Sequence, residues 1–218
     1  MGSGAVKYPR LLVGDVILEQ VRLGPLTNFS YLIAEDDGGE GFVIDPSYEP
    51  EPLLEAIERH RVRVRYILNT HRHHDHTAGN SVVHARTGAR TVAHRLAPTH
   101  PDIPVDDGAE LRVGALSVDV LSMPGHTVDS VFYRFAGYVA TGDTLFVGEC
   151  GRTDLESGDP SAMFDTLLGR VARLDDALVV LPGHDYGTTP TSTIGREKRE
   201  NYTLQPRTRE EFLAFMRA

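Results

Sequence analysis

The sequence of 218 residues has a single cysteine, no tryptophan and no long hydrophobic run. Because Cys150 has no partner in the chain, an intrachain disulfide is excluded and a secreted, disulfide-stabilised fold gains no support. No stretch approaches the roughly 18 apolar residues of a membrane span, and the N-terminus lacks a charged-then-apolar signal pattern. We therefore predict a cytoplasmic protein with no membrane partner.

Basic residues are also in deficit. The chain has 22 Lys and Arg against 31 Asp and Glu, which gives a formal net charge of −9. Nucleic acids and anionic membranes are bound through clustered positive charge, so this balance argues against either as a partner. The expected partner is a small-molecule substrate, and we expect the protein to be a monomer or a homodimer.

Turn residues are plentiful, with 21 Gly and 13 Pro, and they separate short runs rich in β-branched and aromatic residues. These runs predict strands over residues 15–23, 29–35, 41–45, 64–70, 89–94 and 177–185, and hairpins over 109–125 and 130–143 with turns at Gly114 and Gly137. Helical spacing predicts helices over residues 50–60, 77–88, 159–174, 193–202 and 208–218. Strand groups followed by helices favour an α/β fold, a four-layer αββα sandwich that forms a single domain over residues 5–218.

The segment "NTHRHHDHTAGN", Asn69 to Asn80, crowds four histidines and an aspartate into six positions between a predicted strand and a predicted helix. Neutral imidazole and carboxylate are ligands of Zn²⁺, Fe²⁺ and Mn²⁺, and alternate residues of an extended loop project to one side. His71 and His73 alternate in this way, and Asp75 and His76 follow at a spacing that suits a second ion. His74 is expected to point away from His73 and Asp75.

Three further candidate ligands each follow a predicted strand and are preceded by a glycine. They are His126 in "MPGHT", Asp143 in "ATGDT" and His184 in "LPGHD". Since glycine lets the chain turn sharply, each loop can aim its side chain at a shared point, and we expect one site at one edge of the sandwich. Histidines in other contexts are interpreted as solvated or packed, namely His60, His84, His94 and His100.

Taken in order, the seven candidates resemble the complete ligand set of the metallo-β-lactamase-fold hydrolase superfamily. The resemblance implies that fold and two divalent ions, with zinc as first choice and iron or manganese as alternatives. By the same resemblance, the ligands are His71, His73 and His126 on one metal and Asp75, His76 and His184 on the other, with Asp143 bridging them. Two such ions lower the pKa of a shared water toward 7, which favours acyl hydrolysis, and Asp75 is the expected catalytic residue that moves the proton.

Three segments, "TGDTLFVGECGRTD", "PGHDYG" and "TSTIGREKREN", look like the glyoxalase II group, the hydroxyacylglutathione hydrolases. This implies a thioester substrate such as a hydroxyacylglutathione, bound through Arg152 and Tyr186. From the residues alone, Arg152 fits an ion pair with Asp154 or Glu149 equally well, and Tyr186 fits packing. The chain lacks the long C-terminal helical region of that group, and the candidates to replace its basic residues are Lys198, Arg199 and Arg207.

An alternative comes from the persulfide dioxygenases, which share "CGRTD" and the "HDY" loop. Those enzymes hold one Fe²⁺ through two histidines and a carboxylate, which correspond to His71, His126 and Asp143. "LTNFSYLI" looks more like the hydrolases, so a thioester hydrolase is our first prediction, with a dioxygenase second and a lactonase as a further alternative. Cys150 is interpreted as a small buried residue beside the site.

Overall fold

The first sheet is built from the N-terminal half of the chain. The protein is described by a computed structural model covering residues 16–217, so residues 1–15 and 218, parts of the expected domain and of the first expected strand, lie outside the described residues. The sheet has the order β1 Ile17–Leu23, β2 Asn28–Ala34, β3 Glu40–Ile44, β4 Arg63–Leu68, β5 Arg90–His94 and β6 Ile103–Val105. Strands β1 to β3 are antiparallel, as predicted, and β3 to β6 run parallel. The sequence did not predict β6, because Pro104 interrupts a run of only three residues.

The second sheet follows in chain order. Its strands are β7 Glu110–Val113, β8 Leu116–Ser122, β9 Val131–Phe135, β10 Tyr138–Gly142, β11 Val179–Pro182 and β12 Ser192–Thr193. Both predicted hairpins form, and the turn between β9 and β10 has positive φ at Ala136 (42°) and Gly137 (82°), as a tight two-residue turn requires. Strands β10 and β11 are parallel, so the loops that carry Asp143 and His184 leave the same edge of the sheet.

Helices α1 Glu51–His60 and α3 Asn80–Thr87 cover the outer face of the first sheet, where Leu53, Ile57 and Val83 are buried. The helix expected over residues 77–88 is shorter than predicted and is preceded by a single turn, α2 His74–Thr77. The two helices are separated by Ala78 and Gly79, and Gly79 packs closely on the backbone of residues 46–47. A Cβ at this position would lie 2.6 Å from the Ser47 carbonyl oxygen.

The helices that follow β10 lie on the outer side of the second sheet, and the last of them packs against the first. These are α4 Pro160–Phe164, which continues as a π-helical stretch over Asp165–Arg170 and a 3₁₀ turn over Val171–Arg173, then α5 Ile194–Glu200 and α6 Arg209–Phe215. The expected helix over residues 193–202 ends at Glu200, because Asn201 leaves the helix and caps a 3₁₀ turn, Tyr202–Leu204, through its side chain. Within residues 16–217, no helix combines the length and the apolarity needed to cross a bilayer.

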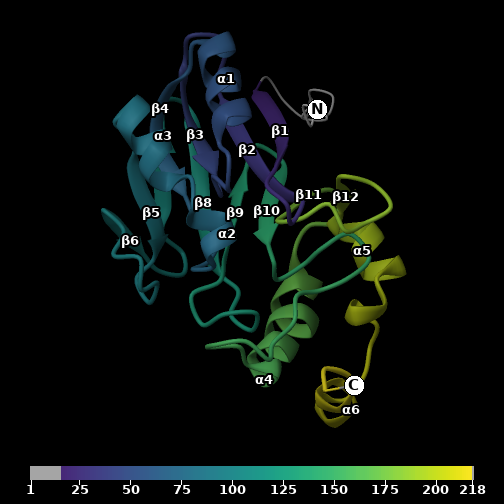
Figure 1. Ribbon diagram of the computed structural model, residues 1–218. Helices are drawn as coiled ribbons and strands as arrows, with labels where there is room; N and C mark the ends of the chain where they lie inside the picture. Colours follow the sequence, from purple (N-terminus) through teal and green to yellow (C-terminus); the bar gives the residue numbers. More distant parts are fainter. Residues whose placement is uncertain (1–15, 218) are drawn as a thin grey trace.

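The main core lies between the two sheets. Along β2, Phe29, Tyr31 and Ile33 point into this core, whereas Leu32 and Ala34 point toward the helices on the other face. Each fully buried side chain of this size stabilises the fold by about 1.5–3 kcal/mol relative to exposure, so both faces of the strand hold the layers together. Figure 1 shows α1 and α3 over the first sheet and α6 at the opposite end of the molecule. The α/β, four-layer αββα, single-domain prediction is confirmed.

Candidate metal centre

Two histidines of the segment Asn69 to Asn80 lie beside His126, in a loop that follows a strand of the second sheet. His71 Nε2 lies 3.0 Å from His73 Nδ1, and His73 Nδ1 lies 3.0 Å from His126 Nε2. His71 and His126 are buried, and His73 is partly exposed. The three imidazoles therefore form a first triad that brings together residues from the ends of β4 and β8, as the sequence predicts.

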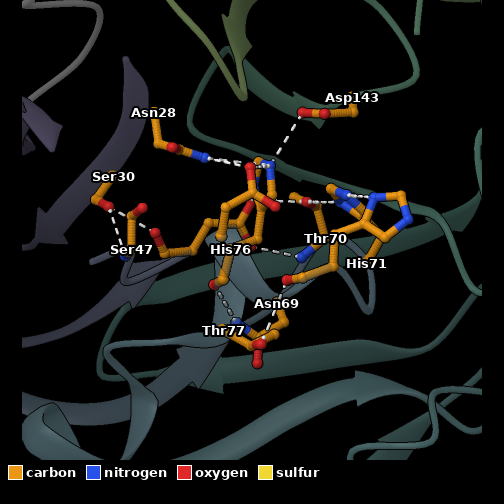
Figure 2. Close-up of polar contacts among 12 residues, drawn as sticks. Asn28, Ser30, Ser47, Asn69, Thr70, His71, His76, Thr77 and Asp143 are labelled. Atoms are coloured by element: carbon orange, nitrogen blue, oxygen red, sulfur yellow. Dashed lines mark hydrogen bonds and ion pairs between the residues drawn. The ribbon is translucent and has the colours of Figure 1, made fainter. Parts of the chain in front are cut away.

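A second triad lies beside the first. His76 Nε2 is 3.2 Å from His184 Nε2, and Asp75 Oδ2 is 3.4 Å from each of these nitrogens. The Nδ2 amide of Asn28 donates a hydrogen bond to the same Asp75 oxygen (2.9 Å). Figure 2 shows Asn28 directed at His76 from the start of β2.

Asp143 lies between the two triads. Its Oδ1 is 3.2 Å from His76 Nε2, and its Oδ2 is 3.3 Å from His184 Nε2 and 3.7 Å from His126 Nε2. One buried carboxylate thus contacts both groups of imidazoles, which is the arrangement expected of a bridging ligand.

Hydrogen bonds on the outer side of the rings fix which nitrogen faces the centre. The Nδ1–H of His126 donates to the backbone oxygen of Arg152, and the Nδ1–H of His184 donates to that of Leu26 (both 2.8 Å). A carbonyl oxygen can only accept, so in neutral imidazoles Nε2 carries the lone pair that points inward. Lone pairs that face one another across about 3 Å repel unless a cation lies between them, so this donor set fits a divalent metal ion.

Asp45 links the two triads through hydrogen bonds, directly to His76 and through Thr70 to His71. Its Oδ2 accepts from His76 Nδ1 (3.0 Å) and from the hydroxyl of Thr70 (2.6 Å), and its Oδ1 accepts from the Thr70 amide (2.7 Å). The Thr70 oxygen in turn lies 3.1 Å from His71 Nδ1, and Figure 2 shows Thr70 beside His71. Although Asp45 also lies close enough to His71 and His76 to form a metal-binding group, its oxygens are already used in orienting them.

Sequence reasoning missed both Asp45 and Asn28. The sequence holds a signal for Asp45, since it ends the predicted strand 41–45 and precedes Pro46, in the same kind of position as the candidate ligands. It differs from His126, Asp143 and His184 in that no glycine precedes it. Asn28 follows a turn in "LTNF", where asparagine is common for reasons unrelated to a metal.

Burial lowers the pKa values of the buried histidines, whereas nearby carboxylates raise them. Burial holds the pKa of His71 well below its usual value, and it also lowers the pKa of His73, so both imidazoles are neutral at physiological pH. Burial alone would lower the pKa of His184 too, but hydrogen bonds to Asp143 and Asp75 outweigh it and raise that pKa to about 9. Asp143 likewise raises the pKa of His76 well above its usual value against the effect of burial. The second triad thus attracts positive charge, and a divalent cation competes with these protons.

A pocket of about 570 Å³ opens over the triads and is lined by both residues predicted to bind substrate. The Tyr186 ring stacks on His184 at 4.6 Å between centroids, with 57% of the residue exposed. The Arg152 guanidinium makes two hydrogen bonds to Asp154 (2.5 and 2.6 Å), which is one of the two interpretations that the sequence left open. His74 is exposed, belongs to neither triad and packs against Tyr48 at the pocket wall.

The C-terminal basic residues do not reach this pocket. Lys198 donates to the Leu174 carbonyl and to Asp176, and Arg207 lies over the Phe215 ring at 4.7 Å. None of the three candidates, Lys198, Arg199 and Arg207, is among the residues that line the pocket. Their proposed role in gripping a substrate therefore gains no support from the pocket lining and stays a prediction. The segment that carries them packs against the loop beside the pocket, where Asn201 donates to the Glu149 carbonyl oxygen (3.1 Å).

Cys150 is buried, belongs to the core cluster on the outer side of the second sheet and is among the residues that line the pocket, as expected of a small residue beside the site. Burial, with the charge of Glu149, raises the pKa of its thiol to about 12. At pH 8 only about one molecule in 10⁴ then carries the thiolate, which is the reactive form. We expect iodoacetamide to leave the folded protein unmodified at pH 8 and to alkylate it rapidly in urea, as measured by intact mass. Equal rates in both states would contradict a buried thiol.

Comparison with known proteins gives relatives of two named kinds. A hydroxyacylglutathione hydrolase of Anaeromyxobacter dehalogenans (strain 2CP-C) is 40% identical over 173 residues, which are 78% of this chain and 66% of that enzyme. The mitochondrial persulfide dioxygenase ETHE1 of Homo sapiens is 29% identical over 222 residues, covering 99% of this chain and 82% of the relative. The crystal structure of ETHE1 from Myxococcus xanthus matches with a TM-score of 0.87 and 33% identity, over 92% of this chain and 90% of that one.

A family model adds the assignment. The model described as the Metallo-beta-lactamase superfamily matches residues 23–116 and 96–184, a range that contains every member of both triads and Asp143. The clusters and the fold together support the use of divalent metal ions. The chain belongs to the metallo-beta-lactamase superfamily.

Proposed function

We propose that this protein is a metal-dependent hydrolase that cleaves a thioester, such as a hydroxyacylglutathione. The observation that carries the proposal is the presence of two complete triads on either side of one carboxylate, which suits two ions rather than one. The relative of 40% identity named as a hydroxyacylglutathione hydrolase supports the same reaction class. Because the chain spans only about two thirds of that relative, the glutathione part of the substrate belongs to the proposal.

The proposed ligands are those expected from the sequence, namely His71, His73 and His126 for one ion, Asp75, His76 and His184 for the other, and Asp143 for both. Zinc is the proposed metal, because imidazole and carboxylate suit it and its coordination is flexible. When bound, such ions lower the pKa of water toward 7 and polarise a carbonyl oxygen.

Asp75 is proposed to act as the base. Burial would raise its pKa, but hydrogen bonding to His184 and the charge of His76 hold the pKa well below the usual value. The carboxylate is therefore ionised at neutral pH, and the Asn28 amide fixes its orientation at the edge of the pocket. It can accept a proton from the attacking water and pass it to the leaving group, which needs little help when it is a thiol with a pKa near 8.5.

The pocket supplies the contacts for the substrate. Tyr186 stacks over His184, and Phe146 packs against both rings, which makes an aromatic wall beside the second triad. We propose that the Tyr186 hydroxyl binds the thiol carrier. The Arg152 guanidinium is 63% exposed and held by an equally exposed Asp154, a pair weak enough for a substrate carboxylate to displace.

Persulfide dioxygenase is the second candidate, and one observation favours it. The ETHE1 relatives match 99% and 92% of this chain, whereas the hydroxyacylglutathione hydrolase matches 78%. In that case one Fe²⁺ would be held by His71, His126 and Asp143, a donor set of two imidazoles and one carboxylate that suits iron.

Metal analysis combined with two assays separates the candidates. The purified protein is analysed for zinc and iron, stripped with a chelator and reloaded with either metal. Each form is then assayed for S-lactoylglutathione hydrolysis and for oxygen uptake with glutathione persulfide. Two metal ions per chain with thioester turnover support the hydrolase. One iron per chain with oxygen uptake and no hydrolysis would replace it with the dioxygenase.

A further inference from the structure

Arg72 lies between two proposed ligands in the sequence, yet it does not line the pocket. Its side chain is only 15% exposed, and its Nε lies 3.3 Å from Asp129 Oδ1. The same guanidinium lies 3.6 Å from Glu156, whose side chain is 93% exposed. Arg72 is therefore directed into the protein, toward the loop that follows His126.

Asp129 is an unusual residue at this position because its side chain is fully buried. Neither of its carboxylate oxygens accepts a hydrogen bond within the part of the chain that the structure describes. Among the described salt bridges, the pair with Arg72 is the one that Asp129 makes. A buried carboxylate without hydrogen bonds is costly, and its single ion pair makes Asp129 dependent on Arg72.

The pair joins the two loops of the first triad. One loop carries His71 and His73 on either side of Arg72, and the other carries His126 three residues before Asp129. One further contact joins the two segments, since the Val131 amide donates to the Thr70 carbonyl oxygen (2.8 Å). Within the second loop, the Thr127 amide donates to the Ser130 hydroxyl oxygen (3.2 Å). Separating the loops would leave the fully buried Asp129 carboxylate without a partner, so the pair resists any widening of the 3.0 Å approach between His73 and His126.

We propose that the Arg72–Asp129 ion pair is a positioning device that sets the geometry of the first triad and thereby its affinity for metal. The inference rests on the proposed ligand role of His71, His73 and His126. Arg72 and Asp129 are positioning residues, because they act through these histidines and touch neither the pocket nor the expected ions.

The test is a zinc titration of the protein in competition with a chromophoric chelator. Arg72→Met and Asp129→Asn each remove one charge at similar size. Each is expected to lower the affinity for one of the two zinc ions by about 10–100-fold, the usual effect of losing a group that orients a ligand. The affinity for the other ion should be unchanged. Glu156→Gln is the matched control, since it changes the exposed partner of the same guanidinium, and wild-type affinity is expected.

The double variant Arg72→Met with Asp129→Leu separates positioning from stability. Replacing a buried ion pair with apolar residues of similar size is neutral or stabilising, so the metal-free double variant should melt near the wild-type temperature. We expect it to fold normally and still to bind one zinc ion more weakly. Wild-type affinity for both ions in this variant would overturn the inference and leave the pair a purely structural one. If the wild-type protein binds no zinc, the ligand assignment fails instead.

Discussion

Asp143→Ala is expected to remove nearly all turnover and to lower the metal content of the purified protein. The carboxylate contacts His76, His184 and His126, so its loss removes the proposed shared ligand from between the two triads. Losing a group that merely orients a ligand costs about 10–100-fold in metal affinity or activity, and losing a shared ligand should cost more than about 100-fold. Metal per chain is measured by elemental analysis, and kcat is measured with the substrate that the assays identify.

His74→Ala is the matched control for this prediction. His74 lies in the same motif and lines the same pocket, but it belongs to neither triad. Its loss should leave metal content unchanged. Equal losses of metal in the two variants would show that the ligand assignment is wrong.

Asp45→Asn is expected to weaken the binding of both metal ions and to destabilise the metal-free protein. Asn tolerates the left-handed backbone of this residue (φ 47°), so the change tests only the carboxylate. The amide has one accepting oxygen, and its NH₂ group faces donors from Thr70 and His76. Each buried donor left without an acceptor costs about 1–3 kcal/mol in the free energy of unfolding. Because Asp45 orients His76 directly and His71 through Thr70, zinc affinity should fall by about 10–100-fold at both sites.

Urea unfolding and chelator competition measure the two effects. Asp106→Asn serves as control, since this aspartate also lies near a histidine, His94, but is 53% exposed. Its change should alter the free energy of unfolding by less than about 1 kcal/mol and leave zinc affinity unaltered. A normal zinc affinity in Asp45→Asn would show that Asp45 is structural only.

The layers of the fold and the triads were predictable because both depend on local patterns. Alternating apolar runs identified most of the strands, and the tight turn at Gly137 formed where predicted. The proposed ligands stand out because histidine and aspartate follow strand ends, where a preceding glycine allows a turn. The prediction of one helix over residues 77–88 was wrong in detail, since the structure has α2 and α3 there. Gly79, between them, packs against Pro46 and Ser47, more than 30 residues away in the chain.

The sequence by itself determined which residue types gather at the edge of the sandwich, because the alternation along a strand and the length of a loop depend on residues that are close together in the chain. Only the tertiary structure decided how those residues are held. Asp45 orients His76 across 31 residues, and Asp129 meets Arg72 across 57, so neither pairing has a local signature. Such contacts form because folding brings distant loops together and because a buried charge needs a partner. Neither condition can be seen in a short stretch of sequence.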